Sequence, residues 1–280
     1  MAKHWGKCAL CGKEDYLTFE HIPPKAAFNS SHSKPVTLQT ILRTPHEYPW
    51  DLSGMKYIDQ QSGLGVYSLC KTCNNLTGSW YGSAYTQFAK AAMDMLCSNI
   101  PEAANGVQFE KIYPLQIIKQ ILSMFCSANP TAAIDDLRAF VLDKNAQGID
   151  KSRYQVRMYF TKTFSKRSCG LFCMCDPRYN SVILASEITV PPFGFVLYID
   201  PPKEVALNGF DITSFTDLPY ETPFSVSMPL LFYEVNNYLP FDYRSKEEIT
   251  TDINTCEEFL RQRNASRNED PVAVAEKESP

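Results

Sequence analysis

The sequence predicts a protein of the α+β class, in which a small cysteine-rich domain precedes a larger domain of helices and an antiparallel sheet. Three observations support this prediction. Two CxxC pairs lie before residue 74, two segments with helical periodicity start after residue 112, and four short β-prone runs follow them. A length of 280 residues also exceeds the usual size of one domain. We therefore place domains at residues 1–98 and 105–263, followed by a disordered tail at 264–280.

Two matched cysteine pairs define the first domain. They are Cys8 and Cys11 in "CALCGKEDYLTFEHIPPKAAF" and Cys70 and Cys73 in "SLCKTCNNLTGSWYG". Two CxxC pairs can surround one tetrahedral Zn²⁺ ion with four thiolate ligands. Such an ion supplies folding energy to a segment that is too small to bury much of a core. The sequence therefore predicts a structural zinc site on these four cysteines.

Helical periodicity marks the start of the second domain. Apolar residues recur at helical spacing in 113–128, and a second helix is expected at 131–143 with Thr131 as its N-cap. Turn-forming clusters then separate four β-prone runs, at 154–161, 170–175, 181–188 and 193–199. These runs predict a small antiparallel sheet. A final helix is expected over 245–263, with Ser245 as its cap.

Composition and charge restrict the class of protein. No run of 18 uninterrupted apolar residues exists, so we expect no membrane span. The first residues, "MAKHWGKC", lack the apolar stretch of a signal peptide, which favours a reducing cytoplasm and thiols over disulfides. The formal net charge is −4, yet residues 1–90 carry nine Lys or Arg against six Asp or Glu. A near-neutral total therefore does not exclude a nucleic-acid partner, because such a partner needs only a local basic patch.

A second motif runs beside the cysteine pairs. After C-x2-C and a short predicted hairpin it contains these residues in order: Glu20-His21-Ile22-Pro23, Leu69-Cys70, Cys73-Asn74 and Gly78. This order resembles the zinc-ribbon branch of the HNH endonucleases, the ββα-metal nucleases, over roughly residues 5–85. The resemblance implies a ββα-metal fold in which His21 is the general base, and Glu20 and Asn74 hold a catalytic Mg²⁺ or Mn²⁺ ion. The zinc ion would then only fix the geometry.

The chemistry of phosphodiester hydrolysis requires these residue types independently of the family resemblance. An attacking water must lose a proton near neutral pH, and an imidazole with a reference pKa of about 6.5 suits that task. A hard cation must neutralise the charge that builds on the phosphate, and it prefers carboxylate and amide oxygens. Adjacent residues on a strand point to opposite faces, so Glu20 and His21 share a site only if the backbone bends there.

The sequence departs from the family pattern at two positions. Family members often carry Asp where Glu20 stands. The central Asn of the pattern, expected near Gly65, is absent. In the family this residue holds the catalytic histidine through a backbone contact, so Gln60, Gln61 or the main chain would have to hold His21 instead.

Structural interpretations stay open for several of these residues. His21 can be a partly buried histidine that bonds a carbonyl group. Asn74 can cap the helix after the second cysteine pair, and Asn75 can be the cap or the ligand in its place. Solvated positions are expected for three other histidines, the last two in a predicted inserted loop at 29–58: His4, His32 and His46. Core packing is expected for aromatic residues that recur at helical spacing after the last zinc cysteine: Trp80, Tyr81, Tyr85 and Phe88.

A basic segment of the second domain is a candidate for contacts with nucleic acid. Residues 151–168 contain six Lys or Arg and no acidic residue, and strand alternation places Arg153 and Arg157 on one side. That side could follow a phosphate backbone, or it could be an ordinary solvated sheet face. Lys25 is included as a third candidate contact.

These predictions combine into one expected function. We expect a metal-dependent endonuclease of the HNH type that hydrolyses phosphodiester bonds of DNA, with duplex DNA favoured over RNA. By analogy with the family, this activity would serve bacterial defence against phage or other foreign DNA. Two alternatives stay open: a zinc-ribbon module that binds nucleic acid or protein without catalysis, and an RNA-directed nuclease toxin. The domain at 105–263 would recognise substrate, a trigger molecule or a partner subunit, or form a homo-oligomer.

Overall fold

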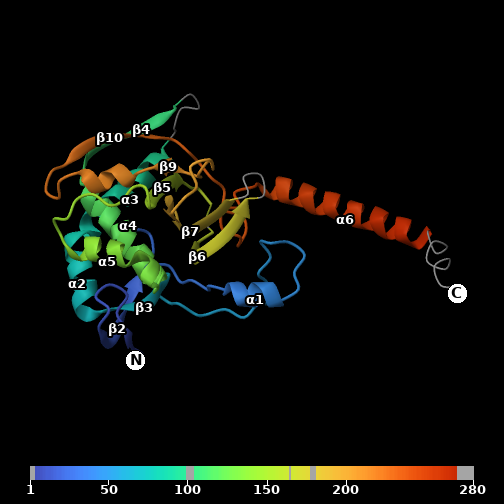
Figure 1. Cartoon of the computed structure of the whole chain (residues 1–280), viewed down its shortest axis with the longest axis horizontal. Helices are drawn as coiled ribbons and strands as arrows, with labels where there is room; N and C mark the ends of the chain where they lie inside the picture. Colours follow the sequence, from blue (N-terminus) through green and yellow to red (C-terminus); the bar gives the residue numbers. More distant parts are fainter. Residues whose placement is uncertain (1–3, 99–103, 164, 177–180, 270–280) are drawn as a thin grey trace, which may run out of the picture.

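The computed structural model describes residues 4–98, 104–163, 165–176 and 181–269. Within these ranges the chain forms helices and three antiparallel sheets, which confirms the predicted α+β class (Figure 1). Most of the helices and strands form one body, from which a loop segment and the C-terminal helix project. Residues 177–180, in one of the turn-forming clusters expected between the β-prone runs, lie outside the described residues.

The N-terminal sheet positions the cysteines and the Glu-His pair. Strands β1 (His4–Lys7) and β2 (Glu14–His21) form a hairpin, and β3 (Gly65–Cys70) pairs with the other edge of β2. Gly12 has a φ of +70° in the hairpin turn, a left-handed conformation that glycine adopts without strain. Helix α2 (Lys71–Trp80) follows β3 directly. Each CxxC pair therefore lies at a chain reversal next to this sheet.

The segment between β2 and β3 is an insertion with one short helix, α1 (Leu38–Arg43), which lies apart from the main body (Figure 1). Asn29 closes the base of this insertion. Its Nδ2 donates to the carbonyl oxygens of Pro23 and Leu64, each at 2.8 Å, and its Oδ1 accepts from the Leu64 N–H at 2.8 Å. One buried amide therefore holds the end of β2 beside the start of β3.

Two long helices form the centre of the molecule. Helix α3 (Gly82–Cys97) comes directly after α2, and helix α4 (Pro114–Ala128) is buried along nearly its whole length. A helix that is buried around its circumference belongs in a core. The first predicted helix of the second domain is thus confirmed. After α4 come the short helix η1 (Ala132–Ile134), capped by Thr131 as predicted, and α5 (Asp135–Leu142).

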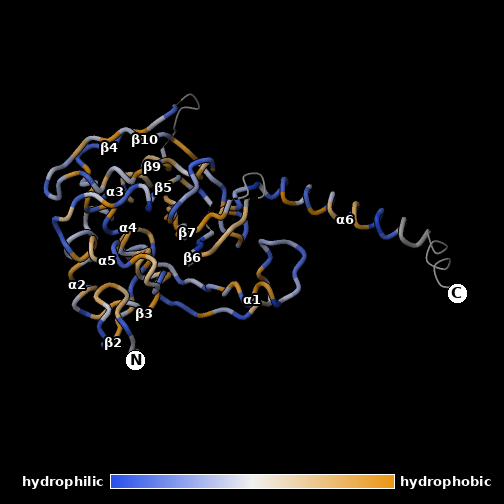
Figure 2. The backbone as a smooth tube through the Cα atoms, in the orientation of Figure 1, coloured by the Kyte–Doolittle hydropathy of each residue, from blue (hydrophilic) through white to orange (hydrophobic). Residues whose placement is uncertain are grey.

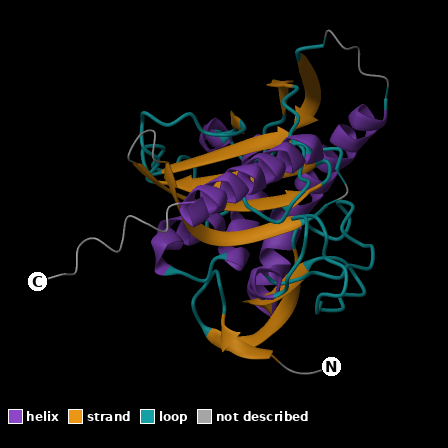
Figure 3. Ribbon diagram, turned by 90° about the vertical axis from the view of Figure 1, so that its right-hand side faces the viewer, coloured by secondary structure: helices purple, strands orange, loops and turns teal. Residues whose placement is uncertain are grey.

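Five antiparallel strands form the largest sheet, in the order β6-β7-β8-β5-β9. They are β5 (Tyr154–Phe160), β6 (Arg167–Asp176), β7 (Ser181–Val190), β8 (Phe193–Ile199) and β9 (Phe210–Asp211). The four predicted runs match β5 to β8, which confirms the predicted sheet. Helices lie across one face of it (Figure 3), where Phe88 of α3 stacks on Phe193 of β8 with ring centroids 4.6 Å apart.

The sequence does not predict the remaining sheet. Its two strands, β4 (Gly106–Ile112) and β10 (Phe224–Pro229), are separated by more than 100 residues. Strand propensity depends on the partner that a strand packs against, and a distant partner leaves no local signal. The short helix η2 (Thr213–Asp217), which lies between these strands in the chain, was not predicted either.

One continuous core contains residues from both halves of the chain. The Tyr81 hydroxyl of the α2–α3 junction donates to the carbonyl of Val141 in α5 at 2.7 Å, and the Tyr220 hydroxyl donates to the Trp80 carbonyl at 2.6 Å. The predicted core aromatics do pack there: Tyr81, Tyr85 and Phe88 are at most 2% exposed, and Trp80 packs against the same cluster. Helices α2 and α3 are therefore fixed against α4 and α5.

Helix α6 (Lys246–Glu269) leaves the body and extends into solvent (Figure 1), with hydrophilic residues spaced along its length (Figure 2). The Oγ of Ser245 accepts from the Glu248 N–H at 3.1 Å, which confirms the predicted cap. The helix continues six residues past its expected end at residue 263. Residues 270–280 of the predicted tail lie outside the described ranges. None of the helices in those ranges combines the length and the hydropathy that crossing a membrane requires.

A buried ion pair fastens the polypeptide around residue 241 to the large sheet. Glu187 of β7 is fully buried, and its Oε1 accepts from the Arg167 guanidinium at 2.8 Å and from the Tyr159 hydroxyl at 2.6 Å. The Tyr243 hydroxyl donates to the same oxygen at 2.9 Å, and the Phe241 N–H donates to Oε2 at 3.2 Å. Each partner offsets part of the cost of removing the carboxylate from water.

We expect Arg167→Met to lower the free energy of unfolding by about 3–5 kcal/mol, because it leaves the Glu187 carboxylate buried without its counter-charge. Urea unfolding followed by circular dichroism measures the change. The matched control is Arg261→Met on α6, whose exposed pair with Glu257 should contribute less than about 1 kcal/mol. Equal effects of the two substitutions would contradict the importance of the buried pair.

Candidate metal centre and cleft

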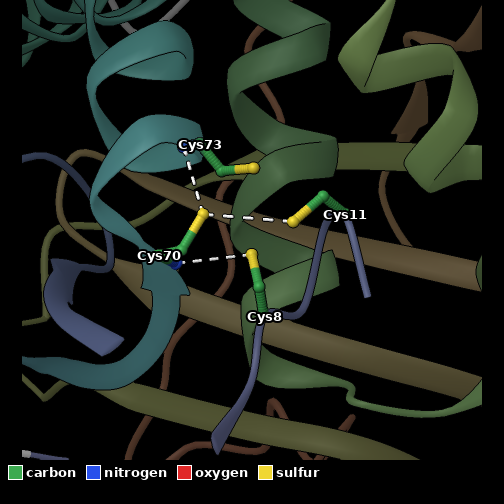
Figure 4. A group of neighbouring side chains, drawn as sticks. All are labelled: Cys8, Cys11, Cys70 and Cys73. Atoms are coloured by element: carbon green, nitrogen blue, oxygen red, sulfur yellow. Dashed lines mark hydrogen bonds between the residues drawn. The ribbon is translucent and has the colours of Figure 1, made fainter. Parts of the chain in front are cut away.

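The four cysteines of the two CxxC pairs converge on one point (Figure 4). Their sulfur atoms all lie within 4.8 Å of one another, and Cys11 Sγ is 3.9 Å from Cys70 Sγ. A tetrahedral zinc ion with Zn–S bonds of about 2.3 Å requires sulfurs about 3.8 Å apart. The donor set and its spacing therefore fit one structural Zn²⁺ ion, as the sequence predicts.

Backbone N–H groups at the start of α2 support these sulfurs. The Cys70 N–H donates to Cys8 Sγ at 3.3 Å, and the Cys73 N–H donates to Cys70 Sγ at 3.5 Å. A hydrogen bond from the Cys73 thiol lowers the pKa of Cys8 to about 4, and the same contact raises the pKa of Cys73. At least one thiolate is thus favoured before any ion binds, and thiolates are the form that ligates zinc.

A cleft of about 640 Å³ lies beside this centre, between the end of β2, the start of α2, α3 and α4. All three residues predicted to carry the chemistry line it: Glu20, His21 and Asn74. Lys25 and Gly78 line it as well. The fold therefore brings the histidine of β2 and the asparagine of α2 to one space.

The main chain orients His21. Its Nε2 lies 3.0 Å from the carbonyl oxygen of Ser62 and donates to it, so Nδ1 carries the lone pair. Among the alternatives for the missing central Asn, the structure therefore uses the main chain rather than Gln60 or Gln61. Burial lowers the pKa of His21, and the nearby charge of Lys25 acts in the same direction. A neutral imidazole with a free nitrogen can accept a proton from water.

The carbonyl bond matches the structural interpretation of His21, but the ring also borders the cleft. Ser62 itself is held in the segment that Asn29 ties down through Leu64. Sequence reasoning missed this role of Asn29. Nothing adjacent to Asn29 in the sequence signals it, because its partners lie at both ends of a long insertion.

Glu20 lies on the buried side of β2 and is 6% exposed. Among the described residues its carboxyl group has no hydrogen-bond or ion-pair partner, and burial raises its pKa to about 7. The pairing of β2 with β3 shifts register between Thr18 and Phe19, where Ser68 of β3 is the extra residue. Glu20 and His21, the last two residues of β2, both border the cleft although they are neighbours on a strand.

Asn74 faces β2. Its Nδ2 donates to the Thr18 hydroxyl at 2.9 Å and to the Phe19 carbonyl at 3.5 Å, which leaves its Oδ1 for another ligand. The cap of α2 is Cys70, whose sulfur accepts from the Cys73 N–H, so Asn74 does not fill that structural role. Asn75 is exposed and does not line the cleft.

Sequence reasoning missed the far wall of the cleft. Gln120 comes from α4 and is 1% exposed, and none of the described residues donates a hydrogen bond to its Oε1. Helix α3 adds four polar residues, which are Ser83, Thr86, Gln87 and Lys90. Their spacing of i, i+3, i+4 and i+7 is visible in the sequence. The aromatic residues of the same segment predict core packing, and only these were interpreted from the sequence.

The structure does not bring Arg153 and Arg157 to the cleft. Arg157 lies on β5 as predicted, whereas Arg153 lies in the turn just before it, and the guanidinium groups of both bond within the protein. Arg153 donates to the carbonyl of Ala133 at 2.9 Å, and Arg157 donates to the carbonyl of Gly209 at 3.0 Å. Their role in binding nucleic acid stays a prediction.

Comparison of the chain with protein-family models, with curated proteins and with solved structures finds no match. The resemblance to the HNH motif therefore stays a prediction from the order of residues in the sequence.

We expect the purified protein to contain one zinc ion per chain, and Cys73→Ser to lose it. Because structural zinc sites contribute several kcal/mol, this variant should melt at least roughly 10 °C lower. Elemental analysis and thermal unfolding measure the two effects. Cys97→Ser, at the exposed end of α3, is the matched control and should keep both zinc and melting temperature. Full zinc content in Cys73→Ser would contradict the site.

Glu20 should make stability depend on pH. Its folded-state pKa of about 7 lies above the ordinary value of 4.5, so the unfolded chain releases the proton first as the pH rises. Stability is therefore lost as the pH rises from 4.5 to 7, and above pH 7 the full cost is about 3 kcal/mol.

Substituting Glu20→Gln removes this cost. The variant should gain stability over the wild type, by about 2 kcal/mol more at pH 8 than at pH 5.5. Urea unfolding of the zinc-loaded proteins, without other divalent ions, measures the difference. If the free energies of unfolding of the two proteins changed with pH in parallel, the Glu20 carboxyl group would have an ordinary pKa. Glu47→Gln, in the insertion and outside the cleft, is the control.

Proposed function

We propose that the protein is a metal-dependent endonuclease that hydrolyses phosphodiester bonds of DNA. The observation that carries this proposal is the meeting of three groups in one cleft: the neutral imidazole of His21, the unpartnered carboxyl group of Glu20 and the free Oδ1 of Asn74. A base and two oxygen donors are what hydrolysis of a phosphodiester requires. The cysteine centre holds the strand and the helix that carry them.

His21 is the general base of the proposed reaction. Its Nε2–H stays bonded to the Ser62 carbonyl, and its Nδ1 takes a proton from a water molecule in the cleft. That water attacks the phosphorus in line, and the 3′ oxygen leaves. Glu20 and Asn74 would hold a Mg²⁺ or Mn²⁺ ion, which would neutralise the charge that builds on the phosphate and the leaving oxygen.

The raised pKa of Glu20 couples metal binding to pH. At neutral pH this carboxyl group is protonated in about half of the molecules that lack the ion. A divalent ion requires the ionised form, so it competes with the proton. Metal affinity should therefore fall below pH 7, which would restrict activity to neutral and alkaline conditions.

The test is cleavage of supercoiled plasmid with Mg²⁺ or Mn²⁺. His21→Ala should lower the rate by about 10²- to 10⁴-fold, since it removes the general base. Bound zinc should be unchanged by elemental analysis. His32→Ala is the matched control, because His32 pairs with Asp59 in the insertion and lies outside the cleft.

The same assay separates the candidate substrates. Single-stranded and duplex DNA and RNA are digested side by side under identical conditions. Preferential cutting of RNA would reassign the substrate, and DNA binding without cleavage under either ion would favour a zinc-ribbon binding module. Equal plasmid cutting by His21→Ala and wild type would remove His21 from the reaction. A defence role against phage or foreign DNA is part of the proposal only if DNA is cut.

A further inference from the structure

Helix α3 presents a polar stripe to the cleft. Its buried face carries the apolar residues that pack in the core: Ala84, Tyr85, Phe88, Ala89 and Ala92. The cleft side carries Ser83, Thr86, Gln87 and Lys90, at positions i, i+3, i+4 and i+7. A helix fixed by one face therefore aligns four polar side chains, each able to donate a hydrogen bond, along one wall.

Gln120 extends this wall from α4. Its Oε1 accepts no hydrogen bond from any described residue, although the residue is 1% exposed. A methyl group placed on Gly82, at the start of α3, would lie 4.0 Å from the Gln120 Oε1, so the amide borders the stripe. A buried acceptor oxygen without a partner is costly to keep. Oε1 can only accept a hydrogen bond, so a phosphate oxygen would be bound by the Nε2–H group of the same amide.

Charge divides the cleft into two sides. The acceptor groups Glu20 and Asn74 come from β2 and α2, and Glu20 is the one acidic residue among the described residues that line the space. Lys90 lies on the stripe and Lys25 on the loop after β2, and neither forms an ion pair within the described ranges. The wall of α3 and α4 therefore has the chemistry of a phosphate site, with ammonium, hydroxyl and amide donors.

We propose that the wall of Ser83, Thr86, Gln87, Lys90 and Gln120 binds the phosphate backbone of the nucleic-acid strand that enters the cleft. From Ser83 to Lys90 the helix rises about 10 Å, which matches roughly three base pairs of duplex DNA at 3.4 Å of axial rise each. Phosphate contacts position a strand without reading its sequence. The inference rests on the proposed function for the identity of the substrate, and it places the contact on α3 and α4 instead of β5.

The first test is the salt dependence of binding. Anisotropy of a labelled single-stranded DNA of about 20 nucleotides is measured at about 50–200 mM salt, without divalent ions other than zinc. Lys90→Gln should reduce the slope of log K against log salt by about 0.7, the value for one lost phosphate contact on a single strand. Lys203→Gln, an exposed lysine in the loop after β8 and outside the cleft, should leave the slope unchanged.

Gln120 is tested with two variants that separate a ligand role from a structural one. Gln120→Glu places a carboxylate against the phosphate and should weaken binding by about tenfold or more. Gln120→Met keeps the size, removes the unpartnered amide oxygen and should raise the melting temperature of the free protein by about 2–4 °C while weakening binding. A purely structural glutamine would give a lower melting temperature and unchanged affinity.

The outcomes distinguish this inference from the proposed function. If Lys90→Gln and Gln120→Glu change nucleic-acid binding as expected but the protein cleaves no substrate, the result would support phosphate binding by the wall and contradict the proposed nuclease activity. The opposite result is cleavage that His21→Ala abolishes, together with an unchanged salt slope in Lys90→Gln and an unchanged affinity in Gln120→Glu. This result would contradict phosphate binding by the wall and leave the proposed nuclease activity intact. A wild-type protein that binds no DNA or RNA at any salt concentration would overturn both.

Discussion

The convergence of four cysteine sulfurs is the constraint on which the N-terminal structure depends. It joins the turn of the β1–β2 hairpin to the junction of β3 and α2, two points 60 residues apart in the chain. Because α2 starts at this junction, the centre also sets where Asn74 lies relative to β2. Asn29 separately closes the base of the long insertion between the two pairs.

The cleft combines groups whose properties come from burial. Desolvation raises the pKa of Glu20 and lowers that of His21, so both groups are neutral over part of the range around pH 7. Gln120 is buried as well, and its Oε1 has no hydrogen-bond partner in the part of the chain that the structure describes. Three polar groups kept in such surroundings reduce the stability of the free protein. Functional sites are where this cost is usually tolerated, because a ligand removes it.

The second half of the chain contributes to the cleft, although it lies far from the cysteine pairs in the sequence. Helix α4 is central to the core, and its Gln120 reaches the cleft between α2 and α3. Tyr81 and Tyr220 tie the same helices to α5 and to the segment before β10. The larger part of the protein therefore supports one wall of the cleft directly, whatever else it recognises.

The sequence by itself determined the cysteine pairs, the main helices and the four long strands, because metal-ligand spacing and apolar periodicity are local signals. The candidate residues Glu20, His21 and Asn74 came from the resemblance of their order in the chain to the HNH motif. Only the tertiary structure decided that Ser62 orients His21, that Asn29 closes the insertion, that β4 pairs with β10, and that Gln120 borders the cleft. Each of these contacts joins residues far apart in the chain, and the burial that shifts a pKa exists only once the chain has folded.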